Sequence, residues 1–316
     1  MNNSMHTLIP YDTTRRSLWD QAVIRARNSH FMFQRGYMEY HADRFPDCSY
    51  MLMRGKKLVA LLPAHRQNGN LISHKGLSFG GWILAPKCLY SDLEAGFSLL
   101  GEEMSRQGLV RLVYSPSPYP YHGGSCDDDL FILQKIGAHC HSMRLGAFLP
   151  ASSGLPNTYG IRRRLRLGET KLPCRFEETE DLDRFWACLT AFLEKRHKAT
   201  PVHSVEEMRL LKRSFPDCIR LIIGRRGSEW LTGRVIYLSR LVLRFQYVFQ
   251  VLESPRVFLH ERMTDWILRQ PDFARSWIDF GTSADPSSGQ LVKPLHLHKE
   301  ILGARGLPLS TWIWEP

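Results

Sequence analysis

The chain has 316 residues, 43% of them hydrophobic, and its 42 Lys and Arg against 31 Asp and Glu give a net charge of +11. This length allows about two domains with buried cores, and no run approaches the ~20 apolar residues that span a bilayer. We therefore expect a folded cytoplasmic protein with no transmembrane segment, no secretion signal within residues 1–14, and a preference for anionic partners.

The first part of the chain predicts short helices, a hairpin and glycine-rich loops. Leu18, Trp19 and Val23 lie at helical spacing and predict an amphipathic helix over 13–27. The β-forming run 71–82 contains three glycines, which indicates bulges or a close approach of the backbone to a ligand. Further predicted elements are a helix over 90–107, a strand over 109–115, an exposed loop over 115–129 near a site, a helix over 127–136 and a strand over 142–149.

The second part repeats a similar order after a linker at 151–160. The predicted elements are a basic helix from about Asn157, helices over 181–197, 205–213, 257–270 and 289–302, and strands over 241–252, 276–280 and 309–314. These boundaries give two domains, 1–150 and 151–316, of the α/β class with mixed sheets.

A hairpin motif occurs twice. Phe45-Pro46-Asp47-Cys48 precedes two β-forming runs, 49–53 and 58–62, that are joined by a basic turn. Phe215-Pro216-Asp217-Cys218 precedes a second such pair, 219–224 and 230–238. The separation is about one domain length, so duplication of one fold unit explains both copies.

The basic and metal-ligating residues allow few conclusions by themselves. The densest basic run, Arg162 to Arg166, is either a solvated helix face or a contact for phosphate or RNA. The seven cysteines are scattered and never form a CxxC pair, so we expect reduced thiols. His139-Cys140-His141 and His296-Leu297-His298 have poor spacing for a metal, because side chains two apart on a helix diverge by ~200°. We expect no metal site.

Five blocks resemble the FemAB-like branch of the GNAT acyltransferases. They cover residues 33–49, 73–81, 201–204, 279–283 and 296–303, in family order across nearly the whole chain. Members similar to this sequence are often found with surface polysaccharide biosynthesis. The resemblance implies an acyltransferase built of two tandem GNAT-like lobes with a cleft between them, in line with the repeated hairpin.

The resemblance also implies a role for Lys299. In FemAB-type transferases the motif similar to Leu297-His298-Lys299-Glu300-Ile301-Leu302-Gly303 supplies a lysine near the acyl carbonyl and its leaving group. A fixed ammonium at Lys299 would stabilise the developing oxyanion, a contribution of about 3 kcal/mol when one such donor is removed. The alternative is a surface lysine on an amphipathic helix.

The resemblance favours acyl-CoA as the donor. GNAT enzymes hold the CoA pyrophosphate on backbone amides at a helix N-terminus, through a Gln/Arg-x-x-Gly-x-Gly/Ala loop. The equivalent loop of the second lobe, Glu253-Ser254-Pro255-Arg256, lacks both glycines, and Gly80 and Gly81 of the first lobe lack the rest of the pattern. Arg256, Gly80 and Gly81 are the candidate cofactor-binding residues, and aminoacyl-tRNA stays open as the donor.

Transfer of an acyl group to an amine needs a proton acceptor and donors for the oxyanion, with no covalent intermediate. The candidate bases are His74, His203 and Asp279, since a histidine pKa of ~6.5 suits proton acceptance at neutral pH. The structural alternative is a hydrogen-bonded histidine in each case, and a turn-capping role for Asp279.

Candidate substrate contacts lie on a loop and on two strands of the chain. Tyr121 and His122 belong to the long loop, where an aromatic ring could stack on a sugar or base. Gln246 and Tyr247 follow the second hairpin, and Ser283 ends the 279–283 block. A packing role for Tyr247 is the alternative.

The sequence thus predicts an N-acyltransferase that moves an acyl group from acyl-CoA to an amine, most directly the amino group of a nucleotide-linked or lipid-linked amino sugar. The acceptor would lie between the lobes. A FemAB-type aminoacyltransferase that uses aminoacyl-tRNA is the second hypothesis, since tRNA would match the +11 charge and the arginine run. The third is a non-catalytic module that binds RNA or another anionic ligand.

Overall fold

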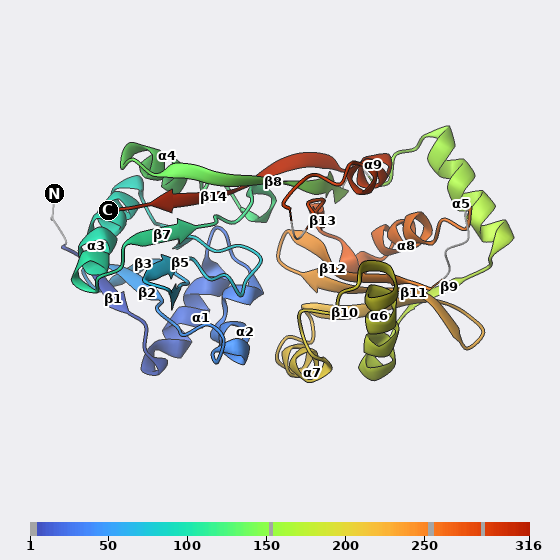
Figure 1. The fold of residues 1–316 in the computed structure, drawn as a ribbon, viewed down its shortest axis with the longest axis horizontal. Helices are drawn as coiled ribbons and strands as arrows, with labels where there is room; N and C mark the ends of the chain where they lie inside the picture. Colours follow the sequence, from blue (N-terminus) through green and yellow to red (C-terminus); the bar gives the residue numbers. More distant parts are fainter. Residues whose placement is uncertain (1–4, 152–153, 252–255, 286–287) are drawn as a thin grey trace. The chain divides into compact units, whose positions relative to one another are not determined.

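The computed structural model describes residues 5–151, 154–251, 256–285 and 288–316. The chain divides into two compact units (Figure 1): unit 1 is Met1–Met143 with Pro308–Pro316, and unit 2 is Arg144–Leu307. The sequence placed the boundary after residue 150. In the structure the last segment of the chain belongs to unit 1, because the end of strand β14 (Arg305–Trp314) pairs with residues 112–114 of that unit. Strands β14 and β8 (His139–Pro150) each begin in one unit and end in the other.

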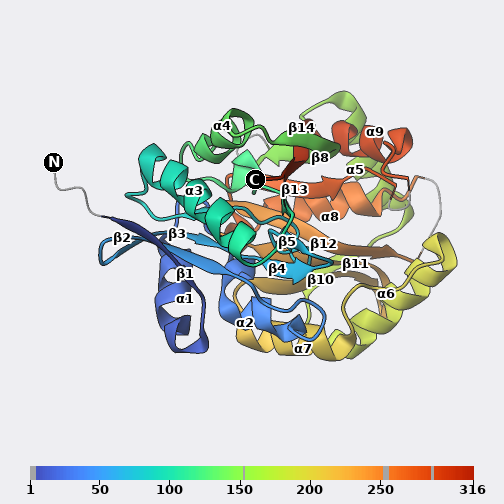
Figure 2. The ribbon, with the colours of Figure 1, turned by 60° about the vertical axis from the view of Figure 1, so that its left-hand side comes forward.

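Unit 1 contains two groups of strands. One is a sheet in the order β1-β2-β3-β6, and the other follows the order β4-β5-β7-β14. Helix α1 lies on one side of β1–β3 and helix α3 on the other (Figure 2). The elements are β1 (His6–Pro10), α1 (Arg16–Arg25), α2 (Arg35–Met38), β2 (Tyr50–Arg54), β3 (Lys57–Leu62), β4 (His65–Gln67), β5 (Asn70–Ile72), β6 (Ile83–Leu84), α3 (Tyr90–Arg106), β7 (Arg111–Tyr114) and α4 (Asp128–Lys135).

The predicted first hairpin is confirmed: β2 and β3 pair antiparallel, with Tyr50 opposite Leu62. Both sides of the hairpin are buried over 50–52 and 59–62, and one side packs in a core that includes Leu52, Trp82 and Phe97. The predicted helix over 90–107 is α3, and its first turn is fixed by Asp92, which accepts a hydrogen bond from the Leu89 amide. The three short strands β1, β4 and β6 were not predicted.

Unit 2 contains the strand order β8-β13-β12-β11-β10-β9, in which only β12 and β13 pair parallel. Helix α8 covers one face of β10–β12, and α6 and α7 cover the opposite face (Figures 1 and 2). The elements are α5 (Tyr159–Lys171), β9 (Arg175–Glu178), α6 (Leu182–His197), α7 (Val205–Ser214), β10 (Ile219–Arg226), β11 (Glu229–Leu238), β12 (Val242–Gln250), α8 (Leu259–Leu268), β13 (Trp277–Thr282) and α9 (Lys293–Ile301).

The second hairpin, β10–β11, is also confirmed, and β11 is buried over nearly its whole length. Gly227 makes its turn with φ of 58°, a backbone angle that glycine adopts without a steric penalty. At Gly233 a side chain would collide with two rings, since a Cβ there would lie 2.3 Å from Phe249 and 2.7 Å from Phe185. The missing side chain lets α6 pack tightly on this sheet.

Strands β12 and β13 separate along their length. Their parallel pairing in the described chain covers only Val242–Arg244 with Trp277–Asp279. Strand β12 also contains a bulge: Phe245 pairs with Ile236 and Tyr247 with Val235, so Gln246 is an extra residue. Because side chains alternate along a strand, the bulge turns Phe245 and Val248 to the same face although they are three positions apart. The separation and the bulge together leave space beside β13.

Candidate functional site

The space beside β13 is a cavity of about 340 Å³ within unit 2. Its wall comes from six elements, α6, β11, β12, α8, β13 and α9, and therefore from residues far apart in the sequence. The lining residues are Phe192, Arg234, Phe245, Val248, His260, Phe280, Thr282, Leu295, His298, Lys299 and Leu302. Most are apolar, and the four titratable ones, Arg234, His260, His298 and Lys299, decide its chemistry.

Lys299 is a buried cation on α9, with only 7% of its surface exposed. Its Nζ donates hydrogen bonds to the carbonyl oxygens of Gly281 at 3.1 Å and Thr282 at 2.8 Å, where β13 ends. Burial lowers the Lys299 pKa to about 8, with Asp279 raising it and Arg244 lowering it. An ammonium has three N–H donors, and these two carbonyls use two of them. The surface-lysine alternative is wrong.

Asp279 is a buried neighbour of Lys299, with 1% of its surface exposed. Its Oδ2 accepts from Arg244 Nη1 at 2.6 Å, and its Oδ1 accepts from the Gly281 amide at 2.6 Å. Arg244 Nε also donates to Gln246 Oε1 at 3.0 Å. These contacts suit a group that holds the end of β13 and the Lys299 ammonium in place. Neither Asp279 nor Gln246 lines the cavity.

Two histidines of the cavity wall, His260 and His298, were not among the predicted catalytic residues. His260 on α8 and His298 on α9 have ring centroids 5.8 Å apart. Burial, together with Arg234 and His298, lowers the pKa of His260 to about 3. Burial also lowers the pKa of His298, partly opposed by Glu261. Both rings are therefore neutral at neutral pH, the form that accepts a proton.

Arg234 is the second buried cation of the cavity, 3% exposed and in the middle of β11. It donates from Nη1 to Thr264 Oγ1 at 2.8 Å and from Nη2 to the His260 carbonyl at 2.9 Å. Its guanidinium carbon lies 4.1 Å from the centroid of the Phe245 ring. Burial lowers the Arg234 pKa to about 9, against an opposing effect of Glu261. One signal could have found it: a charged residue inside the apolar run 230–238.

The other predicted residues of unit 2 lie outside the cavity wall. His203 Nδ1 and Tyr247 Oη are 2.5 Å apart, and Tyr247 packs on Trp186, which is the packing alternative for Tyr247. Ser283 is fully buried, with its Oγ 3.4 Å from His296 Nδ1. Arg256 is exposed with φ of 76°, and the rest of its predicted loop, residues 253–255, lies outside the described residues.

The predicted residues of unit 1 lie in its interior. His74 is 2% exposed, with ring centroids 5.3 Å from His41 and 5.4 Å from His65. Burial lowers the His74 pKa to about 2. A Cβ at Gly80 would lie 2.0 Å from the Ser73 carbonyl oxygen, so the chain's own packing requires this glycine.

Gly81, Tyr121 and His122 are also engaged within unit 1. Gly81 has φ of 81°, and a Cβ there would meet the Tyr114 hydroxyl at 2.7 Å. Tyr121 is 2% exposed with its ring centroid 4.6 Å from that of Phe79, which corrects the expectation of an exposed loop at this position. The His122 side chain bonds to Ser117. Among the predicted residues, the structure therefore brings Lys299 together with Asp279, and His203 together with Tyr247. The predicted residues of unit 1 are buried within unit 1.

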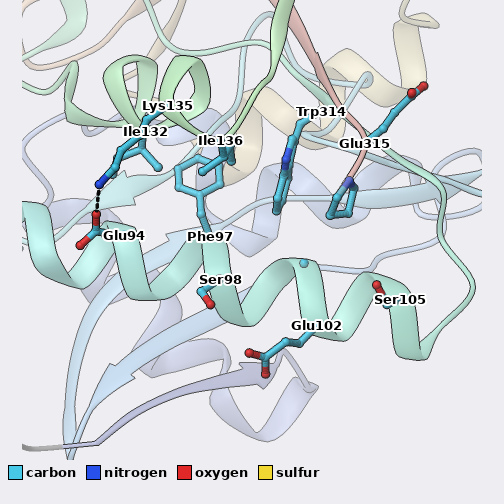
Figure 3. A pocket seen from close by; sticks show the side chains of 12 residues that line it. Glu94, Phe97, Ser98, Glu102, Ser105, Ile132, Lys135, Ile136, Trp314 and Glu315 are labelled. Carbon is cyan, nitrogen blue, oxygen red and sulfur yellow. Dashed lines mark hydrogen bonds and ion pairs between the residues drawn. The ribbon is translucent and has the colours of Figure 1, made fainter.

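Unit 1 has a larger hollow, of about 560 Å³, between α3, α4 and β14 (Figure 3). Phe97, Ile132 and Trp314 point into it, and an exposed Lys135–Glu94 ion pair of 2.7 Å closes one end. Such a pair is solvated, and the hollow has no buried titratable group among its lining residues. Size alone does not give it the chemistry of the unit 2 cavity.

The described residues contain no group of three or more His, Cys, Asp or Glu side chains placed to hold a metal ion. None of the helices in these parts of the chain combines the length and apolarity that a membrane crossing requires.

No family model and no curated protein matches the sequence. Solved structures match nearly the whole chain. FemX matches with a TM-score of 0.69 at 10% identity, covering 98% of this chain and 97% of that one. The C-terminal domain of a putative lysylphosphatidylglycerol synthetase from Agrobacterium fabrum gives 0.63 at 10% identity, covering 96% and 92%. A tandem GNAT protein from the clavulanic acid biosynthesis pathway gives 0.56 at 11% identity, covering 98% of both chains.

The chain has a tandem GNAT-like fold. This confirms the predicted fold class. Within this fold, the described cavity with buried cations belongs to the second of the two units. At these identities the likeness concerns the fold alone.

Proposed function

We propose that the protein is an N-acyltransferase whose reaction centre is the unit 2 cavity. The observation that carries this proposal is the anchored Lys299 ammonium in a largely apolar cavity that also holds two neutral histidines. In the reaction, the lone pair of an amine attacks the acyl carbonyl and forms a C–N bond. The bond to the leaving group then breaks, and the nitrogen gives up a proton.

Lys299 supplies the electrostatic part of this reaction. Negative charge develops on the acyl oxygen in the transition state, and the third N–H of the ammonium is fixed close to the space where the acyl group would lie. Because the carbonyls of Gly281 and Thr282 already hold the ammonium, little reorganisation is needed when the charge develops. This supports the role that the sequence resemblance implied for Lys299.

His298 is the proton acceptor that we propose in place of His203, His74 and Asp279. It lines the cavity next to Lys299 on the same helix and is only half-buried, so a proton can leave it to solvent. Burial keeps its ring neutral at neutral pH. His260 lines the same wall, with a pKa of about 3 that suits a neutral hydrogen-bonding partner better than a base.

The charge of the cavity supports an acyl donor without an ammonium group. The described wall contains two cations, Arg234 and Lys299, and no acidic side chain. The ammonium of an aminoacyl group, such as the lysyl group in the name of the synthetase relative, would be repelled there. We therefore propose acyl-CoA as the donor. Its acyl part would lie against the apolar side chains of the wall, such as Phe245 and Phe280.

For the acceptor we propose a primary amine, and among amines an amino sugar used in surface polysaccharide biosynthesis. This choice rests on the sequence resemblance and on the net charge of +11, which suits a nucleotide-linked or lipid-linked sugar with its phosphates. The cavity supports acyl transfer to an amine without selecting the amine.

One observation favours aminoacyl-tRNA as a second candidate donor. Exposed side chains of Arg162, Arg163 and Arg166 on α5 surround a surface hollow of about 290 Å³. If this face binds tRNA, changing the three arginines to Gln should weaken binding and reduce its salt dependence. The absence of tRNA binding by the wild-type protein at low salt would remove this candidate.

A thiol-release assay tests the proposed function. The full chain is incubated with a panel of acyl-CoA donors and amino-sugar acceptors, and free CoA thiol and acylated amine are both measured. We expect release of thiol that depends on the amine and equals the product formed. Neither thiol nor product with any pair would contradict the proposal and favour a non-catalytic binding module.

A further inference from the structure

We infer that the unit 2 cavity contains a carboxylate subsite, in which Arg234 binds an organic carboxylate carried by one of the two substrates. That the carboxylate belongs to a substrate rests on the proposed acyl transfer. Its binding by Arg234 does not, because it follows from the surroundings of the guanidinium.

Arg234 is a buried cation with no carboxylate partner among the described residues. Its hydrogen bonds go to a hydroxyl and a backbone carbonyl, those of Thr264 and His260. The nearby Glu261 is itself paired with Arg164, whose Nη1 lies 3.0 Å from Glu261 Oε1. Removing a charge from water is costly unless an opposite charge and hydrogen bonds replace the solvent. The chain supplies hydrogen bonds to Arg234 and the more distant charge of Glu261, and leaves a carboxylate in contact with the guanidinium to a ligand.

The guanidinium also has donors to spare. Of the five N–H groups of an arginine, one on Nη1 and one on Nη2 are used, and Nε has no hydrogen-bond partner in the described chain. A carboxylate accepts two parallel N–H bonds in the fork geometry that a guanidinium presents. Phe245 covers one face of the group, which leaves its edge for such an approach.

A purely structural role would not require the positive charge. The two bonds to α8 tie β11 to that helix, and a neutral donor such as a Gln amide makes the same kinds of bond without the cost of a buried charge. The charge of Arg234 is therefore the feature that remains to be explained, and the cavity that it lines gives the explanation.

The rest of the wall narrows the ligand class. Lys299 adds a second cation to the same cavity, whose wall also includes apolar side chains such as Phe245 and Phe280. These features match a short carbon chain with a carbonyl at one end and a carboxylate at the other. The acyl half of a dicarboxylic acid has this form, with its carbonyl at Lys299 and its carboxylate at Arg234. A carboxylate on the amine acceptor is the other source of the same chemistry.

Binding of simple diacids tests the subsite without any assumption about catalysis. Succinate and glutarate are titrated calorimetrically into the full chain, with the uncharged diamides of the same acids as controls. We expect the diacids to bind at least tenfold more tightly than the diamides. Equal binding of diacid and diamide, or no binding of either, would overturn the subsite.

Variants then assign the binding to Arg234. Arg234→Met should abolish diacid binding, and Arg234→Lys, which keeps the charge, should retain part of it. The matched control is Arg262→Met on α8: Arg262 is equally buried, but its donors are used by the carbonyls of Gly168 and Leu172 and by Glu169. Undiminished diacid binding by Arg234→Met would contradict the assignment. If Arg234→Met does not fold, the Arg234→Lys variant and the diacid–diamide contrast decide.

Two comparisons of transfer rates distinguish the source of the carboxylate. If it is on the donor, succinyl-CoA should react faster than acetyl-CoA, and Arg234→Lys should reduce this preference. If it is on the acceptor, carboxylated amines should be preferred in the same way. Transfer with no preference for any carboxylate would contradict the substrate assignment. Diacid binding without transfer from any donor would instead contradict the proposed function and leave the subsite standing.

Discussion

The two hairpins that follow the Phe-Pro-Asp-Cys tetrapeptides lead to different interiors. In unit 2, β11 pairs with the nine-residue β12, which then separates from β13 and leaves a cavity with buried cations. In unit 1, β3 pairs with β6 at two positions only, and the space is filled by Trp82, Phe97 and Tyr114. The second hairpin thus borders a cavity with buried cations, and the first borders an apolar core.

Buried titratable groups are present in both units, so their pKa shifts alone do not mark a site. His65 and His74 in unit 1 have lowered pKa values because they are packed among other rings. Lys299 in unit 2 has a lowered pKa and also lines a cavity that a ligand can enter. The difference shows that a perturbed group becomes a candidate for function when there is space beside it.

Filling each hollow with a large side chain should separate the two units most clearly. Leu295→Trp places a ring in the unit 2 cavity from a half-exposed position, so the fold tolerates it. We expect turnover in the thiol-release assay to fall about 100-fold, since a displacement of ~1 Å at a reaction centre has such an effect. Ser98→Trp in the unit 1 hollow should leave turnover unchanged. Equal losses in both variants would contradict the assignment of the reaction centre to the unit 2 cavity.

Acid should destabilise unit 1 through its histidines. Burial lowers the pKa of His65 to about 4, whereas an unfolded histidine has a pKa of ~6.5. The unfolded state therefore takes up the proton first. Protonation of His65 leaves the free energy of unfolding unchanged above pH ~6.5 and lowers it as the pH falls toward 4. His65→Gln, which can still accept a hydrogen bond from the Lys75 amide, should make this loss less steep.

Hydrogen exchange of peptides from each unit, measured between pH ~7 and ~5, checks the histidine prediction. Protection of unit 1 peptides should fall with pH less in His65→Gln than in the wild type, while unit 2 peptides should behave alike in both. An unchanged pH dependence in unit 1 would show that His65 does not carry the effect.

The smallest predicted effect is a change in the pH dependence of turnover. The Lys299 ammonium is lost as the pH rises through about 8, so the rate should fall on the alkaline side. Asp279 raises this pKa, so Asp279→Asn should move the alkaline fall to lower pH by less than about one unit. A rate that rises through pH 8 in the wild type would instead indicate that Lys299 acts as a base.

Much of the fold could be predicted, because its longer elements follow local patterns. The hairpins and the helices α3, α6 and α7 show alternation or helical spacing over many residues. The strands β1, β4 and β9 have three to five residues each, too few for a pattern to stand out. The bulge at Gln246 depends on pairing with β11 and leaves no local mark in the sequence.

Only the residue of the site that belongs to a recognisable motif could be predicted from the sequence. Lys299 came from a block resembling a known family, and its cavity position supports that reading. Arg234 and His260 lie on β11 and α8, and only the fold brings them beside Lys299. Tyr121 was misjudged because an aromatic residue in a polar loop looks exposed, whereas its ring packs into the core of unit 1.

The most direct test of the account is the turnover of Lys299→Met beside that of Lys293→Met. Both lysines are on α9, but Lys293 is exposed and outside the cavity wall. We expect Lys299→Met to lower turnover about 100-fold, with an unfolding midpoint close to that of the wild type, and Lys293→Met to have no effect. Unchanged turnover in a folded Lys299→Met protein would contradict the assignment of the unit 2 cavity as the reaction centre.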